Sequence, residues 1–252
     1  LLGDSFEALA KAWLFLAGSL FAFTFIKPQM PVVVAVYLLL WSFACWRERR
    51  RFAYGFFAWS ALLAGLSLLV WPHWIPQWLR VLSGYGAYST PALISYSLGP
   101  RWGPLFGPFL TVALLLVAAV LMWRMRGVPA ASPSFGLAMS LLLALTSITL
   151  LPGQAVYDHV VLLPGILLIL WTWREVPLSK RPFRVVLAAA ALVLFWQWTI
   201  AVPLLGIRYL LTPAQFFSNS VYLLPFHAAA SVPLAASAVL GYMMRNTMRE
   251  KQ

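Results

Sequence analysis

The sequence Phe25-Ile26-Lys27-Pro28-Gln29-Met30-Pro31 is a short polar interruption between two apolar runs. Its lysine and glutamine place a charge and hydrogen-bonding groups where a membrane helix meets water. Pro28 and Pro31 keep the first helix from continuing, because proline has no backbone N–H and its ring clashes with the preceding turn. The stretch therefore predicts a turn between two membrane helices, and the rest of the chain indicates which side of the membrane it faces.

The composition is that of an integral membrane protein. Of 252 residues, 62% are hydrophobic and only 10% are charged, whereas soluble domains are less apolar and more highly charged. The net charge of +12 does not indicate nucleic-acid binding. The basic residues cluster between apolar runs, where membrane topology and anionic lipid headgroups account for them. The one cysteine, Cys45, lies inside an apolar run and is interpreted as a packing residue.

Apolar runs long enough to cross the hydrocarbon core recur along nearly the whole chain. The predicted fold is therefore an all-α polytopic transmembrane bundle of about eight spans, forming a single transmembrane domain over residues 1–252. The spans are predicted at 9–26, 31–46, 53–71, 105–123, 135–152, 160–173, 185–205 and 223–244. The chain begins Leu1-Leu2-Gly3-Asp4, so it is expected to be a processed product or the C-terminal part of a longer polytopic protein.

The charges divide between the two sides of this map. Fourteen of the 18 lysines and arginines fall on one side, and the other four are Lys27, Arg80, Arg101 and Arg208. The positive-inside rule makes the first side cytoplasmic and puts both ends of the chain inside a bacterial-type plasma (inner) membrane. The outer face then carries the connections 27–31, 72–104, 153–159 and 206–222.

The longest outer connection is rich in aromatic residues. Trp74 and Trp78 predict a helix lying in the membrane interface between residues 75 and 83. Tyr85, Tyr88, Arg80 and Arg101 follow within the same connection. These residues form either an aromatic belt at headgroup level or a lid that contacts substrate.

Asp158 is the one carboxylate that the map places on the outer face, in the sequence Tyr157-Asp158-His159. An ionisable pair at the membrane boundary is costly unless it is partnered or used. An aspartate beside a histidine can orient that histidine or accept a proton, which makes Asp158 and His159 candidate catalytic residues. The alternative is that Asp158 caps the next helix and pairs with one of the outer cations Lys27, Arg80, Arg101 or Arg208.

Lys27 and Gln29 suit a phosphate group, because an ammonium supplies a point charge and an amide can donate to a phosphoryl oxygen. A lysine that extends its ammonium to the membrane surface explains Lys27 equally well. The three histidines have no metal-ligand spacing, and the chain has no phosphate-binding glycine loop and no nucleophile elbow. No metal or other cofactor is predicted.

The order of these features resembles the C-terminal part of glycosyltransferase family 87, over nearly all of the chain. The resemblance rests on Lys27-Pro28-Gln29, on the arginine-rich stretch 47–51, on the Trp-Pro interfacial connection with its tyrosines, and on Tyr157-Asp158-His159 before a Leu-Leu-Pro run. This family belongs to the polytopic GT-C class and includes polyprenol-phosphate-mannose-dependent mannosyltransferases.

The resemblance implies a fold of the GT-C type and an inverting hexosyltransferase. Such enzymes take a sugar from a polyprenyl-phosphate donor at the outer face and pass it to an acceptor hydroxyl, which a carboxylate deprotonates. Lys27 and Gln29 would contact the donor phosphate, and Asp158 with His159 would line the sugar site. In this class the catalytic carboxylate usually sits in an early outer loop, and this sequence is expected to begin after that region. Either the helices that precede it are missing from this chain, or the protein keeps the scaffold without the usual base. Asp158 replaces it only if it reaches the acceptor.

Two other functions stay open on the sequence alone. One is a non-enzymatic accessory subunit, whose tryptophan-rich faces would bind lipid, pigment or partner membrane subunits. The other is a transporter, which inverted repeats or charges at mid-span would favour. Copurification with stoichiometric partners would distinguish an accessory subunit from an enzyme whose partners are membrane lipid and a lipid-linked donor.

Overall fold

The computed structural model describes residues 2–84, 91–151, 156–175, 196–218 and 231–249. Within these ranges the chain forms helices and the turns that join them, with no β-strand. The helices are α1 (Leu2–Phe23), η1 (Thr24–Ile26), α2 (Val32–Ala44), α3 (Trp46–Val70), α4 (Trp74–Gly84), α5 (Leu93–Ser97), α6 (Gly99–Met125), α7 (Pro133–Thr149), η3 (Val156–Leu162), α8 (Leu163–Glu175), α10 (Trp196–Leu210), α11 (Pro213–Ser218) and α13 (Ser231–Arg249).

The all-α prediction is confirmed for the described residues. Helices α3 and α6 are long and apolar enough to cross a membrane on their own. Shorter apolar helices occupy 12–26, 32–44, 133–149, 158–171 and 201–210. The predicted total of eight spans therefore stays a prediction, and parts of three predicted spans, residues 152, 185–195 and 223–230, lie outside the described residues.

The connection between α2 and α3 is shorter than the sequence predicted. Only Cys45 separates the two helices, and its non-helical backbone (φ −130°, ψ 57°) ends α2 and lets α3 begin in a new direction. The arginines at 47–51 form the first turns of α3, which begins at Trp46 and not near residue 53. Arginine is a good helix former, so a charged stretch continues a helix beyond the apolar run.

Helices α1 and α3 pack against each other through glycine. A Cβ atom on Gly18 would overlap the backbone carbonyl of Phe52, and one on Gly55 would overlap the carbonyl of Phe15. Small residues at such a crossing let two membrane helices approach closely and gain van der Waals contact. Near the C-terminal end of α1, rings from both helices pack together, with the centroids of Phe23 and Trp59 5.3 Å apart.

The side chain of Arg49 joins the start of α3 to the end of α2 and to the chain after α6. Arg49, which is buried, donates to the carbonyl oxygens of Trp41, Arg126, Gly127 and Val128 at 2.9–3.3 Å. Its guanidinium also lies over the Trp41 ring, 4.2 Å from the centroid. The last carbonyls of a helix lack partners within that helix, and these bonds supply a donor to carbonyls at the end of α2 and just after α6.

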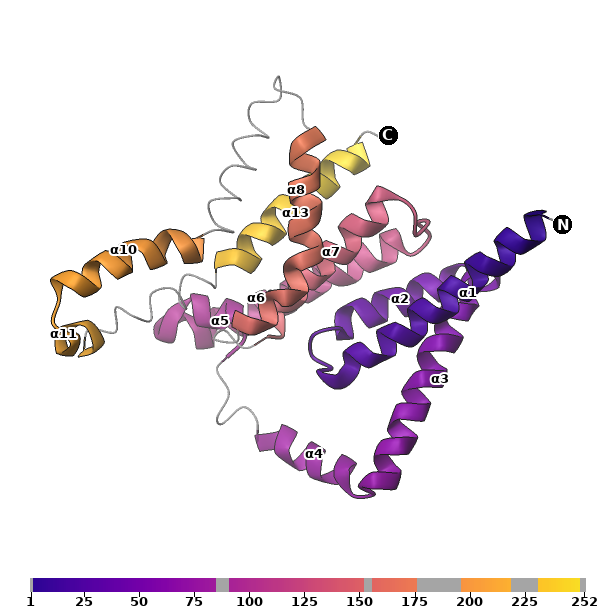
Figure 1. Cartoon of the computed structure of the whole chain (residues 1–252), viewed down its shortest axis with the longest axis horizontal. Coiled ribbons are helices and arrows are strands. Elements are labelled where there is room, and N and C mark those ends of the chain that lie inside the picture. Colours follow the sequence, from indigo (N-terminus) through magenta and orange to yellow (C-terminus); the bar gives the residue numbers. More distant parts are fainter. Residues whose placement is uncertain (1, 85–90, 152–155, 176–195, 219–230, 250–252) are drawn as a thin grey trace.

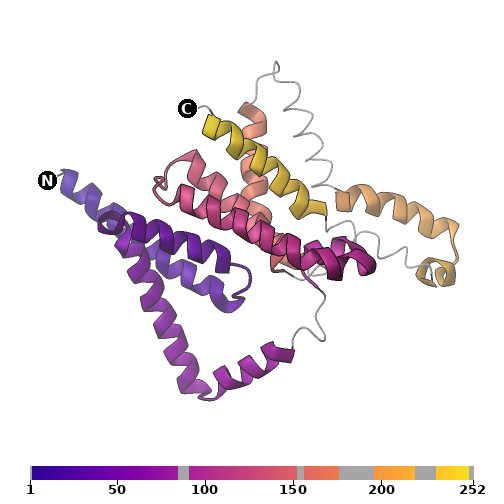
Figure 2. The same ribbon diagram turned by 180° about the vertical axis from the view of Figure 1, so that it is seen from behind.

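The second half of the bundle forms around α7. Helices α6, α8 and α13 pack on it, and α2 joins this group to the α1–α3 group (Figures 1 and 2). Most of α7 is buried, and its side chains belong to the main hydrophobic core. Short helix α5 lies on α6 where Gly103 and Gly107 leave no room for a Cβ beside Ser95. The bundle thus brings the chain after α7 next to the turn between α1 and α2.

Candidate functional site

The turn between α1 and α2 is built by its prolines. After α1 the chain tightens into η1, and Met30 donates its backbone N–H to the carbonyl of Lys27 at 3.1 Å. Pro31 then precedes α2, and its carbonyl accepts from Ala35 at 2.7 Å, which begins the new helix. Proline fixes φ and gives up only a donor that a helix start does not use. The turn therefore holds Lys27 at the end of the helical hairpin.

Asp158 reaches the same place from η3, 131 residues further along the chain. The Lys27 ammonium forms an ion pair and hydrogen bond with Oδ1 of Asp158. The aspartate side chain is 1% exposed, whereas that of Lys27 is 34% exposed. A buried carboxylate is strongly disfavoured without a partner, so this contact fixes η3 against the turn. The ion pair is one of the alternatives that the sequence left open for Asp158.

Two polar atoms at this site have no hydrogen-bond partner among the described residues. They are the second carboxylate oxygen of Asp158, Oδ2, and the ring nitrogen Nδ1 of His159, and both are buried. Burial lowers the pKa of His159, which lies just before the predicted span 160–173, and the neighbouring Asp158 carboxylate opposes that shift. The imidazole is therefore neutral near pH 7. Buried polar atoms of this kind are the ones that a bound hydroxyl group satisfies.

The two clusters of buried charge lie at opposite ends of α2. The turn with Lys27 precedes the helix, and the Arg49 cluster contacts its other end through Trp41. Thirteen residues at 1.5 Å each give a separation of about 20 Å along the helix. Lys27 and Asp158, which the charge map placed on the outer side, therefore lie together at one end of α2. Arg49 and Arg126, which the map placed on the other side, lie together at the opposite end.

For the other predicted site residues, the structure gives the element and, where described, the exposure of each. Gln29 is half-buried in the same turn, two residues after Lys27. Arg80 is exposed on α4, and Arg101 is exposed at the start of α6, where it lies over the Trp102 ring. Tyr157 belongs to η3 by its backbone, and Tyr85 and Tyr88 lie outside the described residues.

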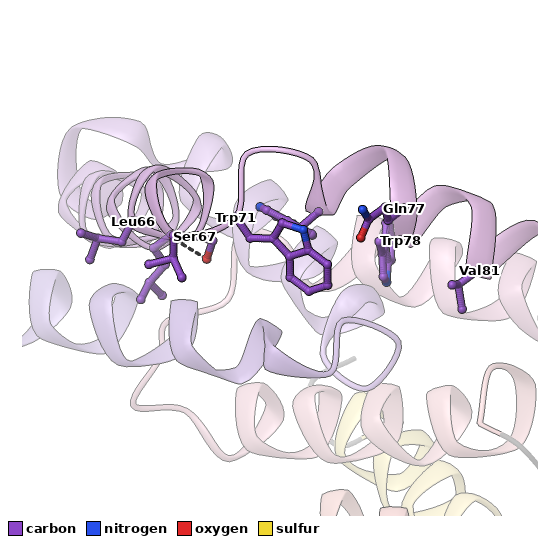
Figure 3. A pocket seen from close by; sticks show the side chains of 9 residues that line it. Leu66, Ser67, Trp71, Gln77, Trp78 and Val81 are labelled. Carbon is purple, nitrogen blue, oxygen red and sulfur yellow. Dashed lines mark hydrogen bonds between the residues drawn. The ribbon is translucent and has the colours of Figure 1, made fainter.

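An apolar groove between α3 and α4 was not predicted. It has a volume of about 730 Å³ and is lined by side chains of both helices, among them Leu66, Trp71, Trp78 and Val81 (Figure 3). Figure 1 shows α4 turning away from the end of α3, and its predicted helical nature between 75 and 83 is confirmed. Tryptophans at 71, 74 and 78 have the spacing of one helix face, which is the sequence signal for this groove.

The comparison with protein families adds what geometry alone does not give. The sequence profile of glycosyltransferase family 87 matches residues 4–152, which is more than half of the chain. The chain belongs to glycosyltransferase family 87. No curated protein and no solved structure matches it significantly.

Membership of family 87 makes glycosyl transfer the reaction class of this membrane protein. The matched region contains Lys27 and Gln29 together with nearly all of the α1–α3 group, the α3–α4 groove and α6. It ends at residue 152, so the assignment does not depend on Tyr157-Asp158-His159. The match is also shorter than the resemblance over nearly all of the chain that the sequence indicated.

Proposed function

We propose that this family 87 protein transfers a sugar, mannose by its resemblance, from a polyprenyl-phosphate donor to a hydroxyl acceptor at the outer face of the membrane. The observation that supports this most strongly is the meeting of Lys27 with the buried Asp158 at one end of the helical bundle. A cation that binds phosphate and a carboxylate that accepts a proton are the two groups that such a reaction requires.

In the proposed reaction, the acceptor hydroxyl attacks the anomeric carbon of the donor sugar and a new C–O bond forms with inversion. The bond between that carbon and the donor phosphate oxygen breaks, and its electron pair leaves with the polyprenyl phosphate. The hydroxyl proton passes to Asp158. Lys27 and the Gln29 amide stabilise the charge on the leaving phosphate, since such preorganised groups are most effective where charge develops.

His159 lines the sugar site beside Asp158 in this account. Its neutral imidazole offers a hydrogen-bonding nitrogen without adding a second cation to the site. Tyr157, Arg80, Arg101, Tyr85 and Tyr88 are proposed as further substrate contacts from the long outer connection and η3. The mechanism needs no metal, because Lys27 supplies the positive charge.

We place the protein in a bacterial-type inner membrane, with Lys27 and Asp158 outside and the Arg49 end facing the cytoplasm. We propose that the chain forms one transmembrane domain. This orientation follows from the positive-inside rule applied to the 14 basic residues on the Arg49 side.

The experiment that tests this function compares donors. Membranes containing the complete protein are given radiolabelled mannose either on a polyprenyl phosphate or on a nucleoside diphosphate, with mixed membrane glycolipids as acceptors. We expect transfer from the lipid-linked donor and none from the nucleotide donor in membranes washed free of other enzymes. Transfer from the nucleotide donor alone would refute the lipid-phosphate donor. Transfer from neither donor, together with stoichiometric copurifying subunits, would favour an accessory role.

A further inference from the structure

The group assigned to the donor phosphate is already paired within the protein. The Lys27 ammonium is bound to Oδ1 of Asp158. A second anion that approaches Lys27 meets an ammonium whose charge is largely neutralised by this carboxylate. The same contact restrains the carboxylate that the proposed reaction uses as a proton acceptor. Both groups are thus engaged with each other and not with substrate.

The two members of the pair differ in exposure. The Lys27 side chain is 34% exposed, and the Asp158 side chain is 1% exposed. An anion can therefore approach the ammonium from outside, whereas Asp158 holds it from within the bundle. A phosphate group offers more oxygen acceptors than a carboxylate. The phosphodiester of the donor carries one negative charge, as a carboxylate does, and a phosphate monoester carries up to one more. Gln29 lies in the same turn and can add its amide to the phosphate.

Asp158 can leave Lys27 only if its charge finds another partner. Its Oδ2 is buried and has no partner among the described residues, and the same is true of His159 Nδ1 beside it. A hydroxyl group that donates to this carboxylate would compensate for the loss of the ammonium, because an unpaired buried carboxylate is strongly unfavourable. The geometry therefore links phosphate binding at Lys27 to hydroxyl binding at Asp158.

We propose that substrates bind by exchange at this ion pair. The donor phosphate takes the Lys27 ammonium, and Asp158 is released to the acceptor hydroxyl. This inference rests on the proposed function and adds that donor binding regulates the base. The carboxylate becomes available as a base only when a phosphate occupies the site, so a hydroxyl is not activated in the absence of donor.

Binding of farnesyl phosphate to the complete protein in phosphatidylcholine nanodiscs, measured by calorimetry, tests the exchange. Asp158→Asn removes the competing charge with little change in shape. If Lys27 is paired in nine tenths of the molecules, removing its competitor strengthens binding by about tenfold. The matched control is Glu48→Gln, which removes one negative charge from the exposed start of α3 at the other end of α2. We expect it to bind as the wild type does.

Unchanged or weaker binding by Asp158→Asn would overturn the exchange and leave the proposed function standing. Absence of binding by the wild type and by Asp158→Asn alike would overturn both. Infrared difference spectra separate exchange from simple repulsion. Farnesyl phosphate should shift the carboxylate stretch of the wild type, and this shift should be missing from Asp158→Asn. A spectrum without that shift would mean that the pair persists, which contradicts the proposal.

A double variant distinguishes loss of the phosphate-binding group from loss of folding. Lys27→Met leaves Asp158 buried without its ammonium, so we expect a lower melting temperature and no farnesyl phosphate binding. Adding Asp158→Asn to Lys27→Met removes the unpaired charge and should restore much of the melting temperature without restoring binding. Restored binding in the double variant would show that Lys27 is not the phosphate group and would overturn the exchange.

Discussion

Arg49 is the buried cation whose role is structural. Its guanidinium donates to four backbone carbonyls from two segments, the end of α2 and the chain just after α6. A planar group with five donors suits such a cluster better than a lysine, which carries a compact charge. Lys27, by contrast, pairs with a carboxylate and is partly exposed. A ligand can therefore reach Lys27, whereas Arg49 is buried and its donors are used by the backbone.

Replacing Arg49 with methionine should destabilise the protein. The variant removes four hydrogen bonds, a buried one to Trp41 and three partly buried ones to the chain after α6, and we expect a loss of roughly 2–4 kcal/mol in the free energy of unfolding. Thermal unfolding in detergent measures it. Arg50→Met is the matched control, because Arg50 is exposed one residue further along α3. Equal loss in the two variants would contradict the role given to Arg49.

His159 predicts how stability depends on pH. Burial lowers its pKa in the folded protein below the value of an unfolded chain. The unfolded state therefore binds more protons as the pH falls through about 6.5, so the contribution of His159 to stability is present above that pH and is lost below it. The stability difference between the wild type and His159→Gln should shrink from pH 7.5 to pH 5.5. A difference that grows toward low pH would mean a raised pKa.

At the scale of helices, the α1–α3 crossing sets the position of the turn that carries Lys27. Gly18→Ala introduces a Cβ that overlaps the carbonyl of Phe52, so the helices must separate. We expect a loss of roughly 1–3 kcal/mol in the free energy of unfolding and weaker substrate binding at Lys27. Gly65→Ala is the control, because nothing lies within 4 Å of the added atom and alanine favours a helix. Equal effects in both variants would contradict the claim that the α1–α3 crossing sets the position of this turn.

The ends of the turn could be predicted because their causes are local. The prolines and polar residues of 25–31 end one helix and begin the next, and η1 ends at Ile26 as expected. The start of α3 was misplaced, since arginine is compatible with a helix and a hydropathy pattern records only the apolar part. The partner of Asp158 was also undetermined from four candidate cations. Only tertiary packing selects among groups 131 residues apart.

For the whole molecule, the central prediction is the orientation in the membrane. In a Cys45→Ser background, Ser83→Cys on exposed α4 should react with a membrane-impermeant thiol reagent in intact cells. Glu48→Cys at the start of α3 should react only after the membrane is opened. The positive-inside distribution of charge is the physical reason. The reverse pattern would put Lys27 and Asp158 on the cytoplasmic face and invert the proposed reaction.

The rate of sugar transfer by Asp158→Asn decides whether Asp158 accepts the proton of the acceptor hydroxyl. Membranes with the complete protein receive labelled polyprenyl-phosphate mannose, and the wild type, Asp158→Asn and Glu48→Gln are compared at equal amounts of folded protein. The account predicts that transfer falls by at least about a hundredfold in Asp158→Asn, as for loss of a positioned proton acceptor, and is unchanged in Glu48→Gln. Transfer by Asp158→Asn at the wild-type rate would contradict it and confine Asp158 to holding Lys27.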